Sequence, residues 1–166
     1  MVIVFTSRKD CVKEIEYSFS NTPYGECLTA WSRGWLCFAT FTPHLTRKVA
    51  LREMRKTFPK ATFSTTKQTF DPTQSRPKRI LLVGTPFQCD VWRALLEVPH
   101  GNRISYSTLA SLASHPTAVR AVATSVGRNP ISVVIPCHRI VPASGGIGKY
   151  HSGAEIKRQL LADEAR

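Results

Sequence analysis

A cysteine and a histidine stand side by side in "VVIPCHRIVP", residues 133–142. Four roles suit this cysteine: metal ligand, half of a disulfide, buried core thiol or nucleophile. A thiol with an ordinary pKa of about 8.5 is only a few per cent thiolate at neutral pH, so a nucleophilic Cys137 needs a nearby base or positive charge. Neighbouring side chains of an extended strand point to opposite sides, so we expect His138 to reach the sulfur through a water or a bend.

The cysteine pattern weakens two of these roles. Five cysteines, at positions 11, 27, 37, 89 and 137, form no Cys-x-x-Cys pair, and their odd number leaves at least one thiol unpaired. This argues against a disulfide framework and against zinc-finger spacing. Two alternatives stay open: a core thiol, because cysteine is often buried, and a zinc site with ligands that converge from Cys11, Cys27, Cys37 and His44.

A nucleophilic cysteine with a histidine base is commonly completed by a carboxylate that orients the imidazole. The C-terminal stretch "GAEIKRQLLADEAR" offers three carboxylates, Glu155, Asp163 and Glu164. The segment "ISVVIPC", residues 131–137, is apolar and rich in β-branched residues. We therefore expect it to run extended through the core and to deliver Cys137 at its end.

Helical patterns precede this segment. In "TPFQCDVWRALLEVPHG", Thr85 suits an N-cap and Pro86 a first helical position, and the apolar stripe predicts a helix that ends near Gly101. The stripe comprises Phe87, Val91, Leu95 and Val98.

Two further short helices are predicted in "SYSTLASLAS" and "PTAVRAVATSVGRN", where Ser114 can cap the second helix and Pro116 can open it. The short turn between them suggests a helix-turn-helix, although an ordinary helical hairpin has the same pattern. Arg120 favours the former, because it stands alone among small residues that would allow close approach to a partner.

The N-terminal half is richer in strands. Four segments, "VIVFTS", "IEYSFSN", "CLTAWSR" and "WLCFATF", predict a small antiparallel sheet. Helical spacing of Leu45, Val49, Leu51 and Met54, with Pro59 as the end, predicts one helix over this sheet. Its basic side chains could touch DNA, but such a run is more typical of a solvated helix face. They are Arg47, Lys48, Arg52, Arg55 and Lys56.

Apolar periodicity disappears in residues 64–79, and we interpret the chain as an N-terminal α/β supporting domain (1–75), a linker (76–83) and a mainly helical domain (84–166). The predicted class is α+β. The 23 Lys and Arg against 11 Asp and Glu give a net charge of +12, which favours nucleic acid or an acidic surface over a merely soluble basic protein. No apolar run approaches the roughly 18 residues of a membrane span, so we expect a cytoplasmic protein, or a nuclear one in a eukaryote.

Ordered motifs carry a family resemblance over residues 84–164: "GTPFQCDVW", "ISYSTLA", "AVRAVA", "GRNP", "IPCHRIV", "GIGKYHSG" and "KRQLL". In order and spacing they resemble the O6-alkylguanine-DNA alkyltransferases, the methylated-DNA-protein-cysteine methyltransferases. The resemblance implies that Cys137 accepts the alkyl group and that His138 acts as a base through a water, held by Glu164. It also implies that Asn129 supports the turn before the cysteine and that Tyr106 donates to the departing guanine.

The same resemblance implies how the DNA is engaged. Arg120 would enter the duplex through the minor groove and replace the flipped base, with Thr117, Ala121, Ala123 and Tyr106 beside the DNA. Backbone groups of Cys137 and Ile140 would contact the guanine, and the pocket wall would include Gly148, Tyr150 and His151. We expect a monomer that reacts once with O6-alkylguanine in double-stranded DNA, without cofactor, metal or membrane.

Three rival hypotheses make different predictions. A non-catalytic alkyltransferase-like protein would have tryptophan in place of Cys137. A transcriptional regulator should present polar base-reading side chains on the second helix, whereas "TAVRAVATSV" is mostly small and apolar. A cysteine hydrolase built on Cys137, His138 and Glu164 would turn over repeatedly through an acyl intermediate.

Overall fold

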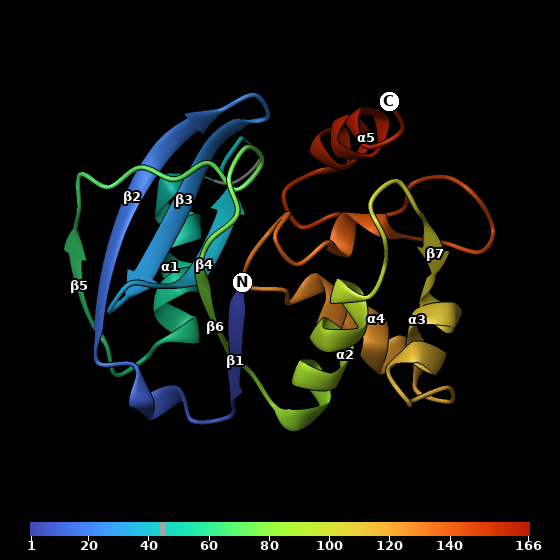
Figure 1. Ribbon diagram of the computed structural model, residues 1–166, viewed down its shortest axis with the longest axis horizontal. Coiled ribbons are helices and arrows are strands. Elements are labelled where there is room, and N and C mark those ends of the chain that lie inside the picture. The colour runs from blue at the N-terminus through green and yellow to red at the C-terminus, as the bar shows by residue number, and fades with distance from the viewer. Residues whose placement is uncertain (44–45) are drawn as a thin grey trace. The chain divides into compact units, whose positions relative to one another are not determined.

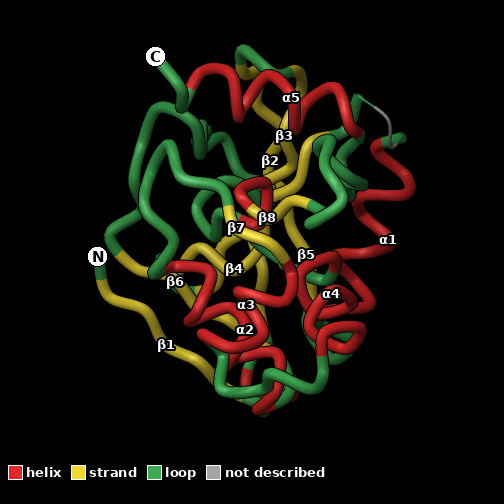
Figure 2. The backbone as a smooth tube through the Cα atoms, turned by 90° about the vertical axis from the view of Figure 1, so that its right-hand side faces the viewer, coloured by secondary structure: helices red, strands yellow, loops and turns green. Residues whose placement is uncertain are grey.

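The computed structural model describes residues 1–43 and 46–166. The chain forms two compact units, Met1–Pro86 with Pro130–Val134, and Phe87–Asn129 with Ile135–Arg166. Strands dominate the first unit and helices the second (Figures 1 and 2). The predicted linker at residues 76–83 is wrong, because Arg79–Val83 form a strand with Ile80, Leu82 and Val83 buried. The run "RILLV" therefore belongs to the sheet of the first unit and is not a linker.

The first unit contains a six-stranded sheet in the order β1-β6-β4-β3-β2-β5. The four predicted strands are confirmed, but the purely antiparallel sheet is not. Strand β5 pairs in parallel with β2, and β6 pairs in parallel with β1. Parallel pairing is possible because the chain returns to the sheet through longer connections than a hairpin turn. The bounds are β1 Val2–Thr6, β2 Glu14–Thr22, β3 Gly25–Ser32, β4 Trp35–Phe41, β5 Thr62–Thr65 and β6 Arg79–Val83, with a 3-10 turn, η1, at Lys9–Cys11.

The predicted N-terminal helix is confirmed as α1, Arg47–Thr57, and it covers one face of the sheet (Figure 1). Thr46 caps it by accepting a hydrogen bond from the Val49 backbone N–H at 3.3 Å. Met54 and Ala50 are fully buried in the core of this unit. Leu45, which contributed to the predicted stripe, lies outside the described residues.

The second unit comprises α2 Pro86–Leu96, β7 Ile104–Ser105, α3 Tyr106–Leu112, α4 Val119–Gly127, the 3-10 turn η2 Cys137–Arg139, β8 Ile140–Val141 and α5 Ala154–Asp163. Pro86 opens α2 as predicted, but the helix ends at Leu96, before Pro99. The Trp92 indole donates to the Ser125 carbonyl at 3.0 Å and so ties α2 to α4. The short strands β7 and β8 pair in parallel (Figure 2). Across the described parts of the chain, no helix has the length and apolar character needed to cross a membrane.

The predicted start of α4 is wrong. Ser114 has a φ of 62° and ends α3, instead of capping α4. Its N–H donates to the Ser111 carbonyl at 3.0 Å, and the His115 N–H donates to the Ala110 carbonyl at 2.8 Å. These two bonds form a Schellman motif. The chain needs a few more residues before it can turn into a new helix, so α4 begins at Val119 and not at Pro116.

The predicted extended run of residues 131–137 is also wrong. Ser132 pairs with β4 through the Ala39 carbonyl at 2.8 Å, but the chain then bends twice. The Val134 N–H donates to the Ser132 carbonyl at 2.9 Å around Val133, whose φ is 69°. This γ-turn is strained for a β-branched residue. A second turn at Pro136 leads directly into the 3-10 turn that contains Cys137.

Two glycines in hairpin turns of the first unit give a matched test of this packing. Both have positive φ, +103° at Gly25 and +79° at Gly34, but a Cβ on Gly25 would lie 2.4 Å from Pro43 Cγ, whereas one on Gly34 would meet nothing within 4 Å. Gly34→Ala should cost about 1–2 kcal/mol from backbone strain alone. Gly25→Ala should cost roughly 1–3 kcal/mol more, because the methyl group also displaces the proline. Urea unfolding of both variants measures this difference, and equal losses would contradict it.

Candidate active site around Cys137

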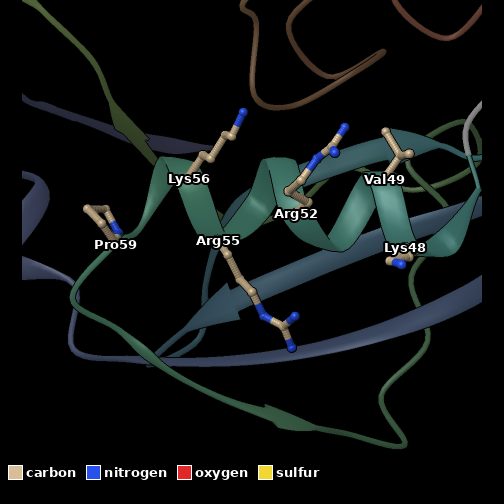
Figure 3. Close-up of a pocket in the computed structure, with 6 residues that line it drawn as sticks. All are labelled: Lys48, Val49, Arg52, Arg55, Lys56 and Pro59. Carbon is tan, nitrogen blue, oxygen red and sulfur yellow. The ribbon is translucent and has the colours of Figure 1, made fainter.

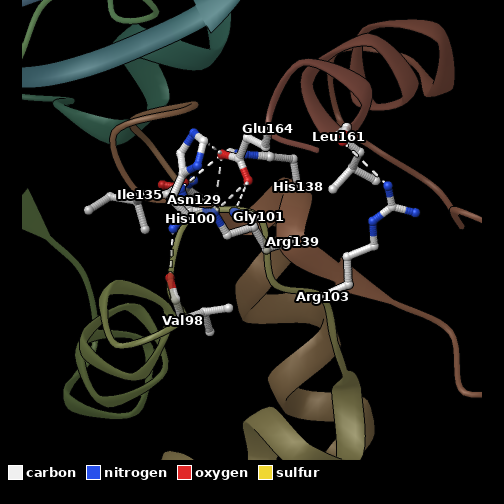
Figure 4. Close-up of polar contacts among 10 residues, drawn as sticks. All are labelled: Val98, His100, Gly101, Arg103, Asn129, Ile135, His138, Arg139, Leu161 and Glu164. Atoms are coloured by element: carbon white, nitrogen blue, oxygen red, sulfur yellow. Dashed lines mark hydrogen bonds and ion pairs between the residues drawn. The ribbon is translucent and has the colours of Figure 1, made fainter. Parts of the chain in front are cut away.

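The Cys137 thiol is held from the end of α4. Cys137 begins η2 and is buried, and the Asn129 side-chain amide lies just beyond α4. One nitrogen of that amide, Nδ2, donates to the Ile135 carbonyl at 2.8 Å and to Cys137 Sγ at 3.0 Å. Figure 4 shows Asn129 beside Ile135. Asn129 therefore fixes both the backbone before the cysteine and the position of its sulfur.

Burial keeps this thiol protonated. It raises the pKa of Cys137 above its ordinary value, and this effect outweighs the hydrogen bonds from Asn129 and Tyr150 and the positive charge of Lys157, all of which lower the pKa. The thiol is therefore neutral at physiological pH. Nucleophilic chemistry at this sulfur requires a base that removes the proton as the reaction proceeds.

The His138 imidazole is the nearest candidate base in sequence, and its ring is oriented by Glu164. His138 Nε2 lies 2.8 Å from Glu164 Oε1, at the C-terminal end of α5. Burial lowers the pKa of His138 in spite of this carboxylate, so the ring is neutral at pH 7. A neutral ring that donates from Nε2 to a carboxylate has its lone pair on Nδ1. Within the described residues, the buried Nδ1 has no hydrogen-bond partner.

The Glu164 carboxylate is the centre of a larger network (Figure 4). Arg139 donates to both of its oxygens, at 2.8 Å from one guanidinium nitrogen and 3.0 Å from Nε, and the Gly101 N–H donates at 3.2 Å. Burial raises the pKa of Glu164, but the hydrogen bonds and charges of His138 and Arg139 hold it well below its ordinary value of 4.5. Of the three carboxylates considered from the sequence, Glu164 is the one that contacts the histidine.

Sequence reasoning missed two cations of this site. Arg139 also donates to the Val98 carbonyl at 2.6 Å and is buried, although nothing in "PCHR" distinguishes it from an exposed arginine. Lys157, in α5, is 1% exposed and donates to the Ile140 carbonyl at 2.6 Å. Burial lowers the pKa of Lys157, while the thiolate form of Cys137 opposes this shift, so Lys157 lies close enough to stabilise a charge on the sulfur. A lysine on the apolar stripe of "AEIKRQLL" was the available signal for this burial.

The predicted aromatic and glycine residues lie in the same unit as the thiol. Tyr106 opens α3 and is half-buried, and burial together with the charge of Cys137 raises its pKa. Tyr150 forms a hydrogen bond that lowers the pKa of Cys137. Gly148 has a φ of +69°, and a Cβ there would lie 2.8 Å from Pro142 Cδ, so this turn excludes a side chain. His151 is exposed and follows Tyr150 before α5.

The residues expected to contact DNA gather on and just before α4. Thr117, Arg120 and Ala121 are exposed, and Ala123 is half-buried. They do not belong to the network around Glu164. Instead, α4 presents Arg120 near its beginning and positions Asn129 just beyond its end.

The structure bears on two of the four roles first considered for Cys137. All five cysteines are free thiols, so none forms a disulfide. Among residues 1–43 and 46–166, no group of three or more His, Cys, Asp or Glu side chains could hold a metal ion. His44, one of the zinc ligands considered, lies outside the described residues.

The chain is similar to known proteins in sequence and in fold. A family model described as the DNA binding domain of 6-O-methylguanine DNA methyltransferase matches residues 86–166. Regulatory protein ada of Salmonella typhimurium is 34% identical over 92% of this chain, which spans 46% of that protein. The chain thus covers about half the length of this curated relative.

Solved structures match this chain over most of their own length. The crystal structure of Mycobacterium tuberculosis O6-methylguanine methyltransferase is 30% identical, with a TM-score of 0.65 over 91% of this chain and 93% of that one. Mycobacterium tuberculosis OGT, crystallised in complex with DNA, is 27% identical with a TM-score of 0.73 over 92% of each chain. Fold and site therefore define a protein with a methyltransferase-type DNA-binding domain. The chain belongs to the O6-methylguanine DNA methyltransferase family, as its motifs predicted.

The Glu164 network predicts a pH-dependent stability. Glu164→Gln should cost about 3–5 kcal/mol of unfolding free energy at pH 7, because it leaves buried Arg139 without its counter-charge. The folded-state pKa of Glu164 is depressed, so the stabilisation is complete above the ordinary value of 4.5 and is lost as the pH falls below it. The difference between wild type and variant should therefore shrink in acid, as urea unfolding over a pH series would show.

Glu155→Gln, on the same helix, is the control for this experiment. Glu155 is 55% exposed and pairs only with surface residues of α5, so its substitution should change the unfolding free energy by less than about 0.5 kcal/mol. Similar losses in the two variants would contradict a special role for Glu164.

Proposed function

We propose that this chain repairs DNA by transferring the alkyl group of O6-alkylguanine in duplex DNA directly to Cys137. The observation that carries the proposal is the pairing of a buried neutral thiol with a neutral imidazole whose Nδ1 lone pair is unused among the described residues. Such an arrangement suits a single proton removal at the moment of attack. Membership of the family supplies the substrate class.

Deprotonation begins the reaction. A water between Cys137 and His138 gives a proton to Nδ1 and takes one from Sγ, so the imidazole becomes imidazolium and the sulfur becomes thiolate. The Glu164 carboxylate accepts the Nε2 proton in a hydrogen bond and stabilises the new positive charge. Lys157 stabilises the thiolate electrostatically, and Asn129 donates to it.

The transfer step exchanges one bond for another. The thiolate attacks the alkyl carbon, the S–C bond forms, and the C–O6 bond breaks with its electron pair remaining on guanine. Tyr106 donates a proton or a hydrogen bond to the guanine ring as this negative charge develops. The raised pKa of Tyr106 keeps its hydroxyl protonated and therefore able to donate.

The product explains why the chain would react once. The alkyl group remains on Cys137 as a thioether, a poor leaving group, and no second nucleophile is assigned to remove it. The reaction needs no cofactor, because the substrate supplies the group and the protein supplies the acceptor. A cysteine hydrolase would instead regenerate its thiol with water and turn over repeatedly.

Access to O6 requires the damaged base to leave the stack. Arg120 is exposed near the start of α4, where it can enter the minor groove and fill the space of the flipped base. Ala121, Ala123 and Thr117 are small, so this helix can lie close to the DNA backbone. Tyr106 opens the neighbouring helix α3 and serves both the DNA and the base.

Backbone groups would contact the flipped guanine. The Ile140 carbonyl accepts from Lys157 at 2.6 Å, and a carbonyl oxygen has a second lone pair for a base amine. The carbonyl of Cys137 is the second acceptor. Gly148 allows the chain to turn closely at the pocket wall, with Tyr150 against the base and His151 at the rim.

The acceptor role of Cys137 gives a stoichiometric prediction. Incubation with excess duplex DNA that contains O6-methylguanine should add one methyl group to the peptide containing Cys137, and to no more than one site per chain. Cys137→Ser should gain none, whereas Cys89→Ser, which removes another buried thiol of the same unit, should gain one as the wild type does. Peptide mass spectrometry decides, and methylation of the Cys137→Ser variant would overturn the proposal.

The role of Arg120 gives a second prediction. Arg120→Ala should slow repair of duplex DNA by roughly tenfold or more, because the flipped state loses its substitute for the base. Reaction with free O6-alkylguanine should stay near the wild-type rate, since the free base requires no flipping. The ratio of the two rate constants is the measurement, and equal losses on both substrates would exclude the intercalating role.

A further inference from the structure

The exposed face of α1 carries a row of cations that the proposed repair chemistry does not use. Five of its eleven residues are basic and one is acidic. Arg47 forms an ion pair with Glu26 and stacks on Phe19, while Arg55 lies over the Phe63 ring at 5.7 Å. These two arginines are therefore directed to their own unit.

The other three, Lys48, Arg52 and Lys56, form what we call the α1 cation row. All three are exposed, and among the described residues no ion pair joins them to a carboxylate. They recur every four residues, so successive positions lie about 6 Å apart along the helix. Figure 3 shows Arg52 and Lys56 pointing to the same side of the helix, whereas Lys48 is seen end-on at the other edge and Arg55 points away from that side. The three residues of the row line a hollow of about 780 Å³, together with Val49, Arg55 and Pro59.

This arrangement is unfavourable for the isolated chain. Like charges four residues apart destabilise a helix, whereas acidic residues between them at the same spacing would stabilise it. The apolar side of α1 is already buried through Ala50 and Met54, and no large hydrophobic residue of this helix is exposed among the described residues. A helix that binds a membrane surface inserts apolar side chains into the lipid, and the exposed face of α1 offers none among the described residues.

We propose that the α1 cation row binds the phosphate backbone of duplex DNA, as a second contact that is separate from the α4 helix. The row has the positive charge and the regular spacing that suit contacts with successive phosphates. It has no exposed aromatic or large apolar side chain that could stack on bases or wedge between them. Its contribution is thus independent of sequence and damage. It holds the chain on undamaged DNA, where most encounters take place.

The test compares two triple variants of the full chain. Lys48→Gln with Arg52→Gln and Lys56→Gln removes the row, whereas Lys13→Gln with Lys67→Gln and Lys78→Gln removes three exposed cations elsewhere in the same unit. Both variants lose the same net charge. Fluorescence anisotropy with an undamaged duplex of about 20 base pairs, over a series of salt concentrations, gives the affinity and its salt dependence.

The row variant should lower the slope of log affinity against log salt by about 2 to 3, and should bind roughly tenfold or more weakly at low salt. The control variant should change the slope by less than about 1. A charge-preserving variant, Lys48→Arg with Arg52→Lys and Lys56→Arg, should keep the wild-type slope, because the contact depends on the charge of these side chains. An unchanged slope in the row variant, or an equal change in the control, would overturn the proposal.

Further measurements separate the partner and the reaction. A single-stranded oligonucleotide of the same length should show a smaller loss than the duplex, and a larger loss would overturn the assignment to duplex DNA. Methyl transfer to Cys137, measured by mass at saturating damaged duplex, should be unchanged in the row variant. The proposed DNA contact is measured on undamaged DNA, and the proposed repair reaction is measured by the modified peptide. Either proposal can therefore be refuted without the other.

Discussion

The Glu164 carboxylate is the interaction on which the site depends. It accepts from His138, Arg139 and the Gly101 backbone, and so joins the C-terminal end of α5 to the cysteine turn and to the loop after α2. A buried carboxylate is costly unless charged and neutral donors surround it, and here both kinds are present. Its negative charge also fixes which imidazole nitrogen carries the proton. Removing this one group would leave a buried arginine unpaired and the His138 ring without its hydrogen bond.

The helix α4 links recognition to chemistry in the proposed function. Arg120 lies at its exposed beginning, and Asn129, which holds the sulfur, lies beyond its end. The helix is anchored by the indole of Trp92 on the Ser125 carbonyl. So short and well-anchored a helix moves as a rigid body. In the proposed function it therefore keeps the flipped base and the thiol at a fixed position relative to each other.

The sequence predicted which side chains lie near Cys137 better than it predicted the path of the chain. Cys137, His138 and Asn129 meet because local spacing and short turns decide their neighbourhood, and Pro86 and the apolar stripe of α2 obey local rules. The errors arise where distant or competing contacts decide: β6 is completed by pairing with β1, and a Schellman motif at Ser114 displaces the start of α4. Burial of Arg139 depends on a carbonyl far along the chain, which no pattern in the sequence reveals, whereas the apolar stripe of α5 gave a signal for Lys157.

Pro130–Val134 lie between two stretches of the second unit in the sequence but belong to the first unit in the fold. The two units are therefore not two separate lengths of the chain. The Ser132 N–H donates to the Ala39 carbonyl, and an isolated parallel bridge joins Ile131 to Ala39, so this segment pairs with β4 of the first unit. A break in the chain near Pro86 would separate two lengths of sequence but not two self-sufficient bodies. Recombination between relatives is therefore expected to preserve the two halves as a matched pair, with the residues on either side of that bond exchanged together.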